Sequence, residues 1–306
     1  MRLFSQCQGP HNPVPRVSKP KILLQLDGDS HASSFDAVVA IDAGVDHLLS
    51  HATVRPENVL GLVHGCMFTR GPDDLRHTAI FVGGSDVEVA EANFQEVCKS
   101  FFGPIRCSVM LDGNGCNTTA AAAVLAAGKH VDITAVTALV LGGTGPVGQR
   151  VARLLAGNGA QVRIGSRRLE RAEATCSELG KLTAVNREQL TPIATHDGIA
   201  LDTALVGVQL VVSAGAAGAV MLPATNRAAA ADLQVAIDLN AVPPAGIEGV
   251  EVTAKAKSMD GLIVHGAIGV GGTKMKIHKA AIRQLLQTND AVLDAEEILA
   301  IGKRLN

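Results

Sequence analysis

The strongest chemical signal in the chain is a glycine-rich turn between a strand-like and a helix-like segment. The pattern G-x-G-x-x-G follows the β-rich run TALVL and precedes the helical run QRVARLLAGNGA. Glycines in such a turn let the backbone approach a pyrophosphate, while the helix N-terminus supplies amide donors and the positive end of a dipole. An ordinary glycine-rich turn is the weaker interpretation in this context. The residues predicted to bind a dinucleotide here are Gly143, Thr144, Gly145, Pro146, Val147 and Gly148.

The end of the next predicted strand indicates which dinucleotide binds. About 20 residues after the glycine turn, an NAD enzyme places Asp or Glu against the ribose hydroxyl. Here the strand QVRIG leads into Ser166, Arg167 and Arg168 instead. Two guanidinium groups suit a phosphate dianion, and their charge opposes the dipole of the helix that starts there. A solvated basic helix start is the alternative, because Arg171 follows on the same face, but the pattern favours NADP.

Two later strand ends complete the predicted cofactor site. Ser213, Ala214 and Gly215 close the strand VQLVVSAG, and Asn240 ends the strand VAIDLN. The carboxyl ends of parallel strands face the crevice in which ligands bind. We therefore expect these backbones to border the nicotinamide, although a plain strand-to-loop turn is equally compatible at Asp238.

Polar residues also gather at predicted strand ends in the first half of the chain. If these strands face the same crevice, the residues could hydrogen-bond a polar small molecule that is rich in ring nitrogens and carbonyls. The predicted substrate-binding residues are Asp27, Asp29, Thr69, Arg70, Asp112, Asn114, Asn117 and Thr118.

The elements that would position these residues alternate between strand and helix. Strands are expected at 21–26, 79–84 and 106–112, and capping boxes at Ser33 and Ser85 open helices, the second of which runs to Phe102. A second series starts near Thr137, and Asp294 caps a terminal helix. This order predicts two α/β domains around a cleft, the second of them a Rossmann-type doubly wound parallel sheet.

The 306 residues are enough for two domains. We expect a disordered leader at 1–19, because this stretch is rich in proline and has no apolar core. Residues 20–130 together with 275–306 would form the substrate domain, which the returning chain end makes discontinuous. Residues 131–274 would form the NADP-binding domain.

Composition excludes several classes of function. The chain has neither Tyr nor Trp, which excludes mechanisms built on a catalytic tyrosine. A net charge of −2 provides no basic field for nucleic acid or an anionic membrane. No apolar run reaches the ~20 residues that span a bilayer, and the leader is unlike a signal peptide. We therefore expect a cytoplasmic protein with no nucleic-acid or membrane partner.

The histidines and cysteines give weaker signals. His47 and His51 stand four residues apart, which could place both on one helix face, but no third ligand is near and no metal site is expected. The six cysteines are scattered in the manner of reduced thiols. Cys116 lies in a polar turn with no evident histidine partner, and we expect it to be structural.

Longer stretches of the chain carry a more specific signal, because they resemble the NAD(P)-dependent methylene-tetrahydromethanopterin dehydrogenases of bacterial one-carbon metabolism. The resemblance covers most of the chain from Lys21 onward. Its matching stretches are SSFDAVVAIDAGVDHL, FTRG, TAIFVGG, FFGPIRCSVMLDGNGCNTTAAA, LGGTGPVGQR, NAVPPAGIEGV and GAIGVGGTKMKIHKA.

The resemblance implies a hydride transfer from the methylene carbon of the pterin carrier to NADP, leaving the methenyl form, in a homo-oligomeric enzyme. By resemblance, Lys274 lies at the cleft and positions the pterin, with Lys276 and His278 behind it. A solvated helix start is the alternative for Lys274. Some relatives also accept methylene-tetrahydrofolate.

The residue chemistry is compatible with this reaction. Loss of hydride from a carbon between two nitrogens gives a resonance-stabilised cation, so the site mainly has to hold donor and acceptor close together. No strong general base is needed, which agrees with a chain without tyrosine. Two alternatives remain: methylene-tetrahydrofolate as the main substrate, and a non-catalytic NADP-binding sensor, which would need no second pocket.

Overall fold

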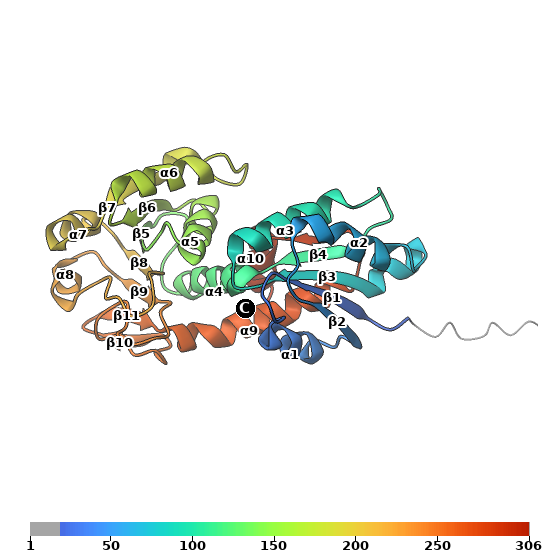
Figure 1. Ribbon diagram of the computed structural model, residues 1–306. Helices are drawn as coiled ribbons and strands as arrows, with labels where there is room; N and C mark the ends of the chain where they lie inside the picture. The colour runs from blue at the N-terminus through green and yellow to red at the C-terminus, as the bar shows by residue number, and fades with distance from the viewer. Residues whose placement is uncertain (1–18, 306) are drawn as a thin grey trace, which may run out of the picture.

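The computed structural model describes residues 19–305, so the leader expected at 1–19 lies outside the described residues except for Lys19. The chain forms two α/β lobes, and helices α4 (Cys116–Ala127) and α9 (Ala267–Leu285) run between them (Figure 1). Two parallel sheets in two lobes confirm the predicted fold class. Within the described part of the chain, no helix is both long enough and apolar enough to cross a membrane.

The first lobe is built on a five-stranded sheet in the order β12-β4-β3-β1-β2, in which every neighbouring pair is parallel. Its strands are β1 (Ile22–Asp27), β2 (His47–His51), β3 (Thr78–Gly83), β4 (Ser108–Leu111) and β12 (Val292–Leu293). Strand β12 comes from the end of the chain and pairs with β4, which returns the chain to this sheet.

Helices cover both faces of the first sheet, and side chains alternate between the two faces. Leu24 and Leu26 face the layer of α2 (Pro56–Met67) and α3 (Val87–Lys99), whereas Leu23 faces α1 (Ser34–Asp42), α4, α9 and α10 (Ala295–Lys303). Short 3₁₀ turns lie at Pro72–His77 and Gly113–Gly115. The buried strands are therefore apolar on both faces, as in parallel sheets generally.

The second lobe is a seven-stranded sheet in the order β10-β11-β9-β8-β5-β6-β7, parallel except for β10. Its strands are β5 (Thr137–Leu141), β6 (Gln161–Ser166), β7 (Leu190–Ala194), β8 (Leu210–Ser213), β9 (Val235–Asp238), β10 (Lys257–Met259) and β11 (Leu262–His265). Its helices are α5 (Pro146–Gly157), α6 (Leu169–Leu179), α7 (Gly198–Leu205) and α8 (Ala224–Ala229), with a 3₁₀ turn at Arg187–Gln189. The strand order reverses between β5 and β8, the point at which doubly wound sheets bind ligands.

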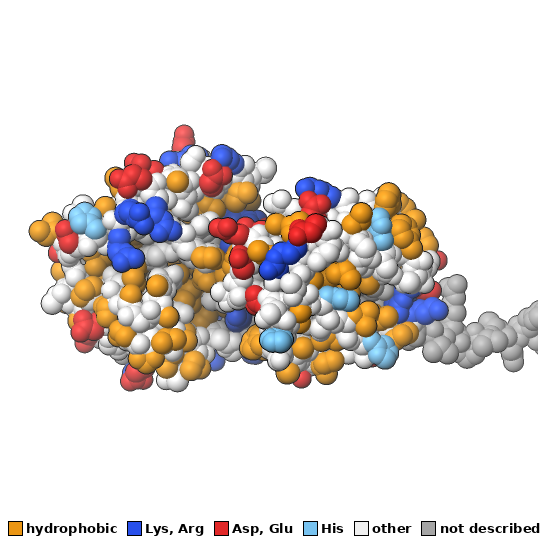
Figure 2. Space-filling model, viewed as in Figure 1, with side chains coloured by type: hydrophobic (Ala, Val, Ile, Leu, Met, Phe, Trp, Pro, Cys, Tyr) orange, Lys and Arg blue, Asp and Glu red, His pale blue; other side chains and the backbone are white. Residues whose placement is uncertain are grey.

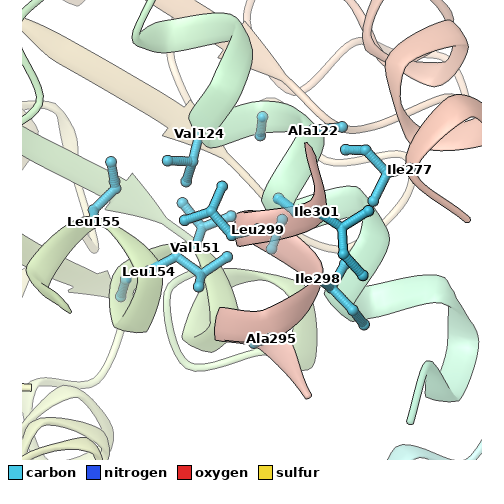
Figure 3. Close-up of a cluster of buried hydrophobic side chains, with 14 of the residues drawn as sticks. Ala122, Val124, Val151, Leu154, Leu155, Ile277, Ala295, Ile298, Leu299 and Ile301 are labelled. Carbon is cyan, nitrogen blue, oxygen red and sulfur yellow. The ribbon is translucent and has the colours of Figure 1, made fainter. Parts of the chain in front are cut away.

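The two lobes share one apolar core. Helix α4 packs against α5, α9 and α10, and their side chains interdigitate between the sheets (Figure 3). Val124, Val151, Leu154 and Leu299 are all buried in this cluster. The core therefore fixes the positions of the two sheets relative to each other.

Several local expectations are confirmed and others are wrong. Ser33 does cap α1, because its hydroxyl oxygen accepts the amide of Asp36 at 3.2 Å. Helix α3 is capped by Asp86 instead of Ser85, and it ends at Lys99, before the predicted Phe102. The backbone there turns at Gly103, where φ is +54° and strand-like pairing of the flanking residues replaces the last helical turn.

Two interpretations that assumed a helix are also corrected. His47 and His51 lie on strand β2, so they do not share a helix face. Among residues 19–305, no group of three or more His, Cys, Asp or Glu is placed to hold a metal. Lys274 lies in the middle of α9 and is not at a helix start.

Candidate functional site

The glycine turn joins β5 to α5 and has no room for a side chain at Gly142, Gly143 or Gly148. Gly142 has a φ of +69°, and a Cβ on it would lie 2.6 Å from the Cα of Gly215 in the turn after β8. A Cβ on Gly148 would overlap the carbonyl oxygen of Gly142 and lie 2.8 Å from the Cα of Gly143. The third glycine of the motif therefore packs α5 onto the turn, and its N-terminal amides face the space above the sheet.

A cavity of about 710 Å³ opens above this turn, between the ends of β5, β6 and β8. Its lining includes seven of the predicted cofactor-binding residues: Thr144, Gly145, Ser166, Arg167, Arg168, Ala214 and Gly215. The predictions missed several further lining residues: Gly142, Gly165, Arg171, Ala216, Ala219, Val220 and Met221. Only Gly142, next to the motif, and Arg171, one turn after Arg167, carried a local signal.

The remaining predicted cofactor residues support the cavity from outside its lining. Gly143 and Gly148 shape the turn, and Pro146 and Val147 begin α5. Ser213 is buried at the end of β8. Asn240 is buried too, and its side-chain amide donates to the carbonyl of Pro244 at 3.0 Å.

Three arginine side chains line this cavity next to the end of β6. Arg167, Arg168 and Arg171 are exposed, and in the described chain none of their guanidinium groups takes part in an ion pair. Figure 2 shows Lys and Arg side chains gathered on this lobe. Ser166 ends β6, and its hydroxyl oxygen accepts the amide of Arg168 at 3.3 Å. Unpaired guanidinium groups beside a hydroxyl form a site for a phosphate dianion.

A second cavity of about 300 Å³ lies at the carboxyl ends of β1, β3 and β4 in the first lobe. Among the predicted residues, Asp29, Asn114 and Lys274 line it. The others in its lining are Ser33, Phe35, Asp36, Gly84, Ser85 and Gly115. The sequence offered Ser33 and Asp36 only as parts of a helix cap.

Two predicted carboxylates lie beneath this cavity and hold its loops. Asp27 is buried and accepts the amides of Asp29 and Ser33, each at 2.8 Å. Asp112 is buried and accepts hydrogen bonds from the Thr118 hydroxyl at 2.7 Å and from the backbone amide of Asn117 at 2.9 Å. These groups shape the pocket through the backbone and do not line it.

The buried side-chain amide of Asn117 continues this network toward the second lobe. Its nitrogen donates to Asp294 at 2.9 Å, and its oxygen accepts from Arg150 of α5 at 2.6 Å. Arg150 in turn reaches Glu91 of α3 at 2.5 Å. The network ties together the elements that carry the two cavities.

Thr69 and Arg70 are not brought together with the other predicted substrate residues. The Arg70 guanidinium donates to the carbonyls of Pro20 and His77, both at 3.0 Å. Those residues precede β1 and β3, so Arg70 lies at the amino edge of the sheet, opposite the cavity. This placement corrects the prediction, because strand ends and strand starts of a parallel sheet lie at opposite edges.

Lys274 reaches the second cavity from α9. Its ammonium nitrogen lies 5.7 Å from the centre of the Phe35 ring and against Gly115, whose φ is +61°. One turn on, His278 is buried and stacks on Phe81 at 5.5 Å. Burial lowers the pKa of His278, so its ring is neutral at neutral pH. Lys276 is exposed and does not line the cavity.

The fold and the first cavity define a class of protein: two-domain α/β proteins with a Rossmann-type nucleotide-binding domain. Shikimate 5-dehydrogenase from Listeria monocytogenes, solved with shikimate and NAD, is similar with a TM-score of 0.56 and 14% identity, over 96% of this chain and 99% of that chain. Quinate dehydrogenase from Corynebacterium glutamicum, solved with NAD, has a TM-score of 0.51 and 13% identity, over 94% and 100%. At these identities the likeness shows the fold.

Sequence relatives define the family. A family model described as methylene-tetrahydromethanopterin dehydrogenase, N-terminal, matches residues 34–114. The bifunctional protein MdtA of Methylorubrum extorquens is 42% identical over 287 residues, which are 93% of this chain and 99% of that protein. The NAD(P)-dependent methylenetetrahydromethanopterin dehydrogenase of the same organism is 32% identical over 282 residues, 88% and 93% of the two chains. The chain belongs to the methylene-tetrahydromethanopterin dehydrogenase family, which confirms the resemblance.

Proposed function

We propose that the protein transfers a hydride from the methylene carbon of methylene-tetrahydromethanopterin to NADP. The observation that carries the proposal is a pair of cavities, one at the carboxyl edge of each sheet. One cavity has a glycine turn and unpaired arginines for a dinucleotide, and the other has Lys274 and polar groups for a second ligand. A sensor would need only the first cavity.

The residues of the first cavity fit NADP. The glycine turn places the amides at the start of α5 where a pyrophosphate can accept from them, and a Cβ on Gly142 would displace the neighbouring Ala214–Gly215 backbone of the same cavity. Ser166, Arg167 and Arg168 would bind the 2′-phosphate. When bound, the nicotinamide supplies the hydride acceptor. Ala214 and Gly215 border the same cavity near the cleft.

The second cavity suits a reaction that releases no proton. Hydride departure from a carbon between two nitrogens leaves a delocalised cation, so the protein needs to orient the donor and exclude water. Lys274 is placed to orient the carrier through its ammonium group, while the buried His278 beneath it is neutral. Asp29 and Asn114 offer hydrogen-bonding groups to the pterin.

We further propose a division into a pterin domain, 20–130 with 275–306, and an NADP domain, 131–274. The two sheets support this division, with α9 crossing the boundary between them. We also propose a cytoplasmic homo-oligomer without nucleic-acid or membrane partners. The five cysteines in the described chain are all free, which fits a reducing compartment, and the charge is near neutral.

The test is an absorbance assay of nicotinamide reduction with methylene-tetrahydromethanopterin, run in parallel with NADP and NAD. Turnover with a strong preference for NADP is expected. Turnover with NAD alone would retain the reaction and refute the role of the arginines. Comparison of kcat/KM with methylene-tetrahydrofolate decides which carrier is the main substrate. Tight NADP binding without turnover of either carrier would instead favour the sensor.

A further inference from the structure

The position of Lys274 raises an electrostatic question about the proposed reaction, and the following inference rests on that reaction. Oxidation converts the neutral methylene centre of the one-carbon carrier into a methenyl cation, and the Lys274 ammonium group in the same cavity opposes this change. Among residues 19–305, Lys274 has no ion-pair partner within 4 Å that would neutralise it. A compensating negative charge must therefore come from the rest of the cavity lining.

Two carboxyl groups line the cavity, and their surroundings differ. Each oxygen of Asp29 accepts one hydrogen bond from Ser85, one from its amide at 2.9 Å and the other from its hydroxyl at 2.8 Å, so its charge is partly balanced by these donors while a lone pair on each oxygen stays available to a ligand. Asp36 lies on the first turn of α1, which packs against α9. Its Oδ2 lies 3.5 Å from the position that a Cβ on Gly83 would occupy. The carboxyl group therefore lies over the end of β3.

We propose that the Asp36 carboxylate is the counter-charge for the cationic methenyl product. It offsets Lys274 in the cavity and interacts more strongly with the oxidised carrier than with the neutral methylene form. A group whose interaction strengthens as charge develops lowers the barrier for hydride departure, whereas a group that binds both forms equally does not.

The charges around Asp36 support this role. The titratable groups that act on Asp36 from neighbouring elements are Asp27, Asp112 and Lys274, and Asp29 lines the same cavity. Burial is the main reason that the pKa of Asp36 is raised to about 6, and Asp112 and Asp27 raise it further, against the opposing effects of Ser33 and Lys274. The carboxyl is thus ionised at pH 7 at a cost in solvation, as is common for groups retained at functional sites.

The reaction itself consumes and releases no proton. The C–H bond breaks with its electron pair, which passes as hydride to the nicotinamide, and a nitrogen lone pair forms the new C=N bond. The carrier is oxidised, NADP is reduced, and the positive charge moves from the nicotinamide ring to the carrier. Any dependence of the hydride step on pH between 5 and 8 therefore reports a side chain in the site, and Asp36 is placed to be that side chain.

The first experiment measures binding without turnover. Fluorescence titration of the protein with methenyl- and methylene-tetrahydromethanopterin, without nicotinamide, gives the ratio of the two dissociation constants. Asp36→Asn is expected to weaken binding of the cationic form by about tenfold to a hundredfold and to leave the neutral form nearly unchanged. Asp42→Asn is the matched control, because it removes an exposed carboxylate from the same helix, where it pairs with Lys279.

The second experiment follows kcat for oxidation of the methylene form against pH. In the wild type, kcat is expected to fall as the pH drops through about 6 and Asp36 is protonated. Asp36→Asn is expected to be slower at pH 7 and flat over that range, with the thermal unfolding curve confirming that it folds.

These measurements separate the two proposals. Equal weakening of both carrier forms, or a raised KM with an unchanged kcat and pH profile, would overturn the role of Asp36 as a counter-charge. A wild-type protein that turns over neither carrier would overturn the proposed function itself.

Discussion

Replacing Gly115 with alanine changes the position of the Lys274 ammonium without removing its charge. Gly115 precedes α4 with a φ of +61°, and an added Cβ would overlap Lys274 Nζ and lie 3.2 Å from Cε. The left-handed backbone costs an alanine roughly 1–2 kcal/mol. The contacting atoms belong to the flexible end of a side chain, so the protein is expected to fold while the ammonium moves.

The expected consequences for activity and stability differ in size. A displacement of about 1 Å in a positioning group can reduce the rate roughly a hundredfold. The backbone strain alone lowers Tm by only about 2–8 °C. Gly207→Ala is the matched control, because Gly207 has a φ of +69° and nothing lies within 4 Å of an added Cβ. We expect similar shifts in Tm for the two variants and a large loss of kcat only in Gly115→Ala.

Steady-state kinetics with the methylene carrier and NADP, beside thermal unfolding of both variants, provide the assay. A kcat for Gly115→Ala equal to that of Gly207→Ala would refute the reasoning, because the geometry of Lys274 would then not matter. A Tm loss in Gly115→Ala far above that of the control would mean that the steric overlap is relieved by the backbone and not by the lysine.

Three further predictions address the cofactor, the pocket and the lobe junction. Arg167→Ala should weaken NADP by about 1.5–3 kcal/mol with little effect on NAD, as measured by titration calorimetry; an equal loss for both would show that Arg167 does not bind the 2′-phosphate. The folded-state pKa of Asp36 is about 6, above its ordinary 3.8, so its ionisation costs stability above pH 6. Asp36→Asn should therefore raise the free energy of unfolding above pH 6 by about 1–3 kcal/mol and have almost no effect below about pH 3, as measured by urea unfolding at both pH values. Arg153→Met removes ion pairs from α5 to Asp294 and Glu296 at the start of α10, and should lower the free energy of unfolding by about 1–3 kcal/mol; an unchanged denaturation midpoint would contradict this.

The features that could be predicted from the sequence are those that depend on neighbours a few residues away. The turn after β5 needs glycines because strand, turn and helix follow one another within about ten residues. The caps at Ser33 and Asp294 form from side chains that reach amides three residues on. The arginines after β6 were recognisable because a helix start with unpaired positive charge is unusual in any context.

Other features were decided only by the tertiary structure. Polar residues flank the strands at both edges of a parallel sheet. Only the strand direction in the folded protein shows that Arg70 lies at the amino edge, away from the cavity. Asp27 and Asp36 are both carboxylates at the same edge, yet Asp27 binds backbone amides and Asp36 lines the cavity. Which of the two carboxylates is available to a ligand depends on the loops and on α9 packed around them, and these come from distant parts of the chain.

The sequence by itself determined the fold class, the dinucleotide turn and the family, because each is expressed in contiguous residues. Only the tertiary structure decided that β12 completes the first sheet, that β2 is a strand, and that Lys274 and Asp36 meet in one cavity. The physical reason is that burial and electrostatic potential at a site are sums over all neighbouring elements. Such sums are defined only once α1 and α9 have packed together.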